Sequence, residues 1–147
     1  SSLADLALVF FNGASSPAPE YYRVTLDEAG ATLPAGGYLV VHMAAVTPAP
    51  GALSILKTAM AIQNGPDAVA LVNVRDNSVL DALSYEGAST QGTLGNGTVL
   101  DIAEGGAAPA DTGDGSLGRI PNGQDTDDNA ADFSLNSTPT PGAANVP

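Results

Sequence analysis

A run of acidic and amide side chains near the C-terminal end is the part of the sequence best suited to chemistry. Asp125, Asp127 and Asn129 alternate along the chain, and Asp132 follows three residues later. Oxygen ligands at alternate positions match the first three ligand positions of a calcium loop, because calcium prefers hard carboxylate and amide oxygens. These four residues are therefore the predicted metal site, with calcium as the expected ion.

The rest of the calcium-loop pattern is missing from this stretch. Ala130 stands where the loop needs glycine, and Asn136 stands where it needs a bidentate glutamate. The segment is therefore not an EF-hand, and any calcium site here has another geometry. The competing interpretation is a solvated acidic turn in which Asp128 or Asn129 caps a short helical turn.

Catalytic groups are sparse. His42 is the single histidine, no Gly-x-Ser-x-Gly motif accompanies it, and there is no cysteine to act as a nucleophile. A serine-histidine-acid triad needs a histidine with both a serine and an orienting carboxylate in reach. We expect no enzymatic activity, and we expect Arg119 to pair with local carboxylates or backbone carbonyls as a structural residue.

The charge balance limits the partners. Sixteen acidic residues oppose four basic ones, which gives a formal net charge of −12. A field of this sign repels phosphate backbones and anionic lipids, so we expect no direct nucleic-acid binding. No apolar run approaches the ~20 residues that span a bilayer, so we expect no membrane span.

The elements that must position these residues are strands. Short runs rich in Val and Leu are separated by Gly, Pro and Asn, which is typical of an all-β chain. The pattern predicts strands at residues 6–11, 21–26, 38–42, 68–74, 79–85, 98–102, 116–120 and 133–135. The run at 38–42 is the one expected to be most buried, and 68–74 with 79–85 is expected to form a hairpin. Residues 52–62 fit either one short helix or a loop.

Several segments resemble the lamin tail domain family in its secreted bacterial form. Residues 33–41 read LPAGGYLVV, residues 62–72 read IQNGPDAVALV and residues 83–87 read LSYEG. Closer to the C-terminus, residues 116–123 read SLGRIPNG and residues 140–145 read TPGAAN. These motifs occur in the family's order and together cover about residues 6–145. The resemblance implies one domain over 1–147 with an immunoglobulin-like β-sandwich fold, outside the cell or on its surface, and a structural or binding role rather than an activity.

One departure from the family concerns the start of the fold. Members usually begin with one or two further strands, whereas residues 3–13 resemble a later strand of the pattern. A sandwich that lacks its first strands has an open edge and a groove, which strand addition from another chain can fill. The extended proline-rich tail, residues 136–147, is the expected donor, with Asn136, Pro139, Pro141 and Val146 as assembly residues. Two alternatives stay open: the tail folds back on its own domain, or the first strands lie outside this sequence.

The resulting hypothesis is a secreted, non-catalytic structural module. It assembles with copies of itself into a fibre or surface layer by pairing strands between subunits. The alternative is an accessory binding domain of a secreted enzyme that holds a polysaccharide, a cell-surface or matrix polymer, or DNA-associated material, with calcium as a possible requirement.

Overall fold

A computed structural model describes residues 1–111, 115–136 and 138–146. Within these residues the largest element is a six-stranded sheet with the order β6-β5-β1-β2-β7-β8. Its neighbours pair antiparallel, except for a short parallel contact between β2 and β7. The strands are β1 (Leu6–Asn12), β2 (Ala18–Thr25), β5 (Asp67–Asn73), β6 (Ser78–Tyr85), β7 (Gln91–Thr93) and β8 (Val99–Asp101).

The central strand β1 is apolar on both faces, which means that both faces of the sheet are covered. Ala7, Val9 and Phe11 point into the larger core, and each is fully buried. Tight packing here explains Gly92 on β7, because a Cβ at that position would lie 2.7 Å from the Phe11 ring. Leu8 lies on the opposite face and packs in a second core.

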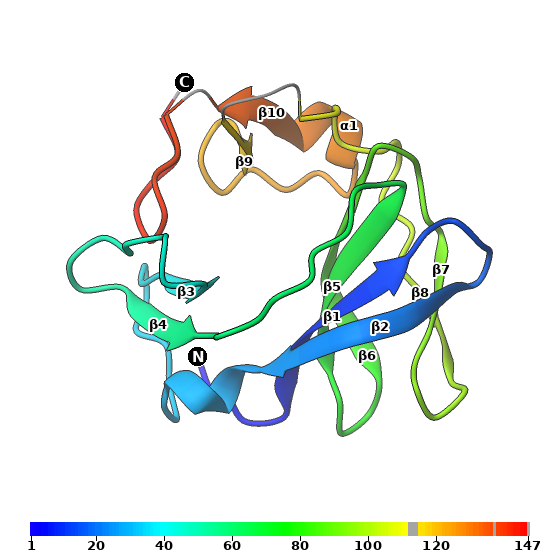
Figure 1. Ribbon diagram of the computed structural model, residues 1–147, viewed down its shortest axis with the longest axis horizontal. Coiled ribbons are helices and arrows are strands. Elements are labelled where there is room, and N and C mark those ends of the chain that lie inside the picture. The colour runs from blue at the N-terminus through cyan, green and yellow to red at the C-terminus, as the bar shows by residue number, and fades with distance from the viewer. Residues whose placement is uncertain (112–114, 137, 147) are drawn as a thin grey trace.

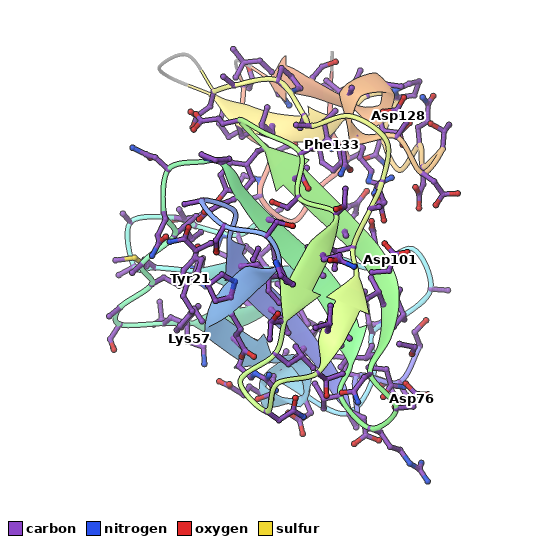
Figure 2. The ribbon with its side chains drawn as sticks, turned by 90° about the vertical axis from the view of Figure 1, so that its right-hand side faces the viewer. Tyr21, Lys57, Asp76, Asp101, Asp128 and Phe133 are labelled. Atoms are coloured by element: carbon purple, nitrogen blue, oxygen red, sulfur yellow. The ribbon has the colours of Figure 1, made fainter. Side chains whose placement is uncertain are left out.

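The sheet curls until its two edges approach each other, so it has a barrel-like shape (Figures 1 and 2). The segment that follows β8 runs along β6, the opposite edge strand. The Ala108 amide donates to the Ser84 carbonyl at 2.8 Å, and Ala108 forms an isolated parallel bridge with Tyr85. The larger core therefore lies inside the curl, where Leu100 and Ile102 meet the strands β1 and β5.

Two small sheets face the outside of the curl. In the described part of the chain, β3 (Leu39–His42) pairs parallel with β4 (Leu53–Leu56), and β9 (Ser116–Arg119) pairs antiparallel with β10 (Phe133–Asn136). Two short helical turns accompany them: η1 (Leu26–Ala29) and α1 (Asn129–Asp132). Figure 1 shows β3 and β4 at the opposite end of this layer from β9, β10 and α1.

The structure confirms the all-β prediction and the hairpin, which forms from β5 and β6. Residues 52–62 contain the strand β4 and no helix. The expectation that 38–42 is the most buried strand is wrong, because all four residues of β3 are only half-buried. This strand belongs to the thin outer layer, where it forms the small two-stranded sheet with β4. The immunoglobulin-like arrangement of two continuous sheets, and the loss of its first strands, stay predictions.

Candidate interaction site

Arg119 at the end of β9 organises the acidic part of the molecule. Its guanidinium lies 4.9 Å from the centroid of the Phe133 ring and donates to the Gln124 carbonyl at 2.9 Å. Four carboxylates surround it: Asp81 at 2.6 Å, Asp125 at 2.8 Å, Asp132 at 3.6 Å and Glu104 at 3.9 Å. The prediction that Arg119 pairs with local carboxylates and carbonyls is confirmed.

The pKa values of the four carboxylates are shifted in different directions. Burial raises the pKa of Asp81 and of Glu104 above their ordinary values, although Arg119 acts in the other direction. The side-chain hydrogen bond from Arg119 lowers the pKa of Asp125. The pKa of Asp132 is lowered chiefly because the Thr126 amide donates to its Oδ2 at 2.7 Å. One guanidinium thus holds together a cluster whose formal charge is negative.

Of the four residues predicted to bind calcium, the structure brings Asp125 and Asp132 together at the Arg119 guanidinium. Asp125 and Asp132 accept hydrogen bonds from protein donors, and Asp127 is exposed with a positive φ of 56°. Within the described residues, no group of three or more His, Asp or Glu side chains is arranged to hold a metal ion. Asp128 caps α1, since its side chain accepts from the Ala130 amide at 3.1 Å, which confirms the capping interpretation. Calcium binding stays a prediction.

Asn129, the fourth predicted ligand, instead caps the edge of the sheet. It is 1% exposed. When the Asn129 amide is oriented so that its nitrogen faces acceptors and its oxygen faces a donor, the nitrogen donates to the Ala82 carbonyl at 3.1 Å and the oxygen accepts from the Ser84 amide at 3.1 Å. Glu104 accepts from the Ala82 amide at 2.7 Å. Two side chains thus occupy backbone groups of β6 that a further strand would otherwise pair with, which blocks strand addition there. The sequence-based predictions did not include Glu104, because this residue lies in a stretch without a periodic pattern.

The proline-rich tail lies against its own chain. The Pro141 carbonyl accepts from the Ala49 amide at 2.8 Å, and Asn145 donates its side-chain nitrogen to the Arg119 carbonyl at 3.1 Å. Among the predicted assembly residues, Asn136 is buried at 3%, Pro141 is half-buried, and Pro139 and Val146 are exposed. The tail therefore takes the alternative path in which it folds back, and its role in assembly stays a prediction.

A groove lies on the outer face of the large sheet, between that sheet and β9 and β10. Its larger lobe has a volume of about 360 Å³ and its smaller lobe about 110 Å³. The lobes share Val69 and Leu83, so they are continuous. Leu117 of β9 and Phe133 of β10 line the opposite wall. The signal for this groove is the apolar outer face of β1, which the small sheets cover only in part.

A second surface is defined by the absence of charge. Residues 33–56 and 133–146 contain no Asp, Glu, Lys or Arg. The tail contacts bring these segments together along one side of the molecule (Figure 1). A hollow of about 400 Å³ lies where they meet, and all its lining residues come from them. Of the nine exposed large hydrophobic side chains among the described residues, six belong to these two segments: Tyr38, Met43, Val46, Leu56, Leu135 and Val146. We call this surface the charge-free face.

His42 shows no catalytic arrangement. Its Nδ1 lies 3.0 Å from the Met43 carbonyl oxygen, and the ring is half-buried at the end of β3. No hydrogen bond joins it to a Ser, Asp or Glu side chain among the described residues.

Comparison with protein-family models, with curated proteins and with solved structures finds no match to this chain. The resemblance to lamin tail domains therefore stays a prediction based on the motifs alone. Neither helical turn in the described residues has the length and hydropathy of a helix that crosses a membrane.

Proposed function

We propose that this chain is a non-catalytic structural module that associates with copies of itself through the charge-free face. The observation that carries the proposal is the concentration of exposed apolar side chains on a surface without charge, in a molecule of net charge −12. Exposed apolar surface, where it gathers into a patch, marks interaction sites in soluble proteins. An extracellular location, as the family resemblance implies, belongs to the same proposal.

The charge distribution favours a second copy as the partner. Two chains of charge −12 repel each other wherever their acidic surfaces meet. The repulsion between two copies is weakest where their charge-free faces meet. Contact through this face also requires no oppositely charged surface on the partner. A face that meets its own copy gives an isologous contact related by a two-fold axis, the commonest arrangement in homo-oligomers.

Sedimentation velocity and light scattering over a wide range of protein concentration test this proposal. We expect reversible association that strengthens in about 1 M salt, where the Debye length falls to about 3 Å and the repulsion is screened. V46E and V146E place a charge on exposed positions of the charge-free face, which are 42% and 46% exposed, and should weaken association.

Two matched controls carry the same change elsewhere. L80E and V99E alter side chains that are 52% and 50% exposed on β6 and β8, outside the charge-free face. These variants should associate nearly like the parent protein. The proposal is wrong if the parent protein stays monomeric at every protein and salt concentration. It is also wrong if all four variants lose association to the same extent.

A further inference from the structure

The groove on the large sheet follows the strand direction. Its floor consists of cross-strand rows, because Phe10, Val69 and Leu83 pair side by side, and Leu8, Leu71 and Asp81 form the next row. Successive rows on one face of a sheet are about 6.6 Å apart. A floor of this shape fits an extended peptide, whose side chains on one face have the same spacing.

A buried carboxylate lies in the next row of the same sheet face, outside the residues that line the groove. Asp67 pairs with Tyr85 and with Asn12, in the row next to Val69 and Leu83 and on the same sheet face. It is 1% exposed, its Oδ1 accepts from the Gly13 amide at 3.1 Å, and its Oδ2 has no hydrogen-bond partner within the described residues. A buried carboxylate oxygen without a donor is costly, and native proteins rarely leave one.

The mouth of the groove is acidic as well. Glu86 and Asp111 line the larger lobe, whereas Asp81, which lines the smaller one, is already paired with Arg119 at 2.6 Å. No Lys or Arg occurs among the described residues that line either lobe. An occupant of this groove therefore meets an apolar floor and wall with carboxylates at the mouth, so its charge complement is basic.

We propose that the groove binds an extended segment of a different protein in which apolar and basic residues alternate. The apolar side chains would lie over Val69 and Leu83, and the basic ones would reach the carboxylates at the mouth. A second copy fits poorly, because the chain has only four Lys and Arg residues, and Arg23, Lys57 and Arg119 are held in ion pairs within it. This surface is distinct from the charge-free face, so the proposal does not depend on self-association.

The probe is an N-acetylated, C-amidated pentapeptide that alternates valine and lysine, and its control carries glutamate in place of lysine. Binding is measured by calorimetry and located by the methyl NMR signals of Val69 and Leu83. We expect the lysine peptide to bind and to shift these methyl signals, whereas the glutamate peptide leaves them unchanged.

A pair of charge variants separates a local site from the attraction of the whole acidic molecule. E86Q removes a carboxylate at the mouth, and D76N removes one from the turn at the far end of the β5–β6 hairpin, near the bottom of Figure 2. We expect E86Q to weaken binding about 1.5- to fivefold, the range of one exposed charge pair, and D76N to leave it unchanged.

Three results would overturn the proposal. If E86Q and D76N weaken peptide binding equally, the peptide is attracted by the net charge of the whole molecule and not by the groove. Equal binding of the two peptides, or no binding of either, would remove the role of the carboxylates. Methyl shifts confined to residues 33–56 would place the peptide on the charge-free face instead.

Discussion

Replacing Asn129 by alanine tests whether a side chain protects the edge of the large sheet. The substitution leaves the Ala82 carbonyl and the Ser84 amide without partners, on residues that are only 3% and 4% exposed. An unsatisfied buried polar group costs about 1–3 kcal/mol, so the two together should lower the free energy of unfolding by about 2–6 kcal/mol. With a urea m-value of about 2 kcal/mol/M, the unfolding midpoint falls by about 1–3 M.

Urea unfolding followed by far-ultraviolet circular dichroism measures this change, since the chain has no tryptophan. N96A is the matched control: Asn96 is exposed in the turn between β7 and β8 and accepts one hydrogen bond, from the Thr98 amide at 3.0 Å. Its loss should cost about 1 kcal/mol or less. If N129A destabilises the protein no more than N96A does, the edge-capping argument is refuted.

Further predictions concern the tail, the acidic cluster and the tyrosines. Gly142 and Gly123 both have positive φ, but only at Gly142 would a Cβ meet a neighbouring methyl group, at 2.7 Å. G142A should therefore loosen the tail and increase its cleavage by proteases, whereas G123A, with open space around it, should carry only the backbone strain; equal cleavage of both would contradict the observed tail path. Burial raises the pKa of Glu104, so the folded state binds its proton more tightly than the unfolded state does, and this residue's contribution to stability grows as pH falls from the raised pKa toward 4.5. E104Q keeps the acceptor and should flatten that part of the stability-pH curve in chemical denaturation; an unchanged curve would contradict the burial argument. Burial also raises the pKa of Tyr21 and of Tyr85, so absorbance at alkaline pH should show two tyrosines ionising above the usual value of 10. The Y21F and Y85F variants should each remove one of these late transitions, and a parent protein without late transitions would refute the assignment.

Local patterns were enough to predict most strands. Short apolar runs between turn residues indicated β1, β2, the β5–β6 hairpin, β9 and β10, because period-two alternation and turn chemistry act over a few residues. The same patterns could not distinguish β3 from a core strand. Leu39, Val40 and Val41 form an apolar run, which favours a buried strand. In the structure this strand lies in the thin outer layer, so its residues are only half-buried.

For the candidate site, too, the sequence indicated where polar residues lie but not which groups they contact. The alternation of Asp125, Asp127 and Asn129 indicated a place for polar chemistry, but spacing along the chain does not say which donor each oxygen meets. Asn129 contacts β6, whose sequence lies more than forty residues earlier, and Arg119 pairs with Asp81, 38 residues earlier. Such long-range partners are fixed by the packing of α1 and β9 against the sheet, which no local pattern encodes.

The sequence by itself determined the all-β class, the strong acidity and the scarcity of catalytic groups, because these depend on composition and on short-range periodicity. It also contained the two charge-free segments, 33–56 and 133–146, as separate stretches. Only the tertiary structure joined them, through the contacts of Pro141 and Gly142 with the segment between β3 and β4. The reason is physical: a surface forms from residues that are near in space, and the curl of the sheet and the return of the tail decide which segments become neighbours.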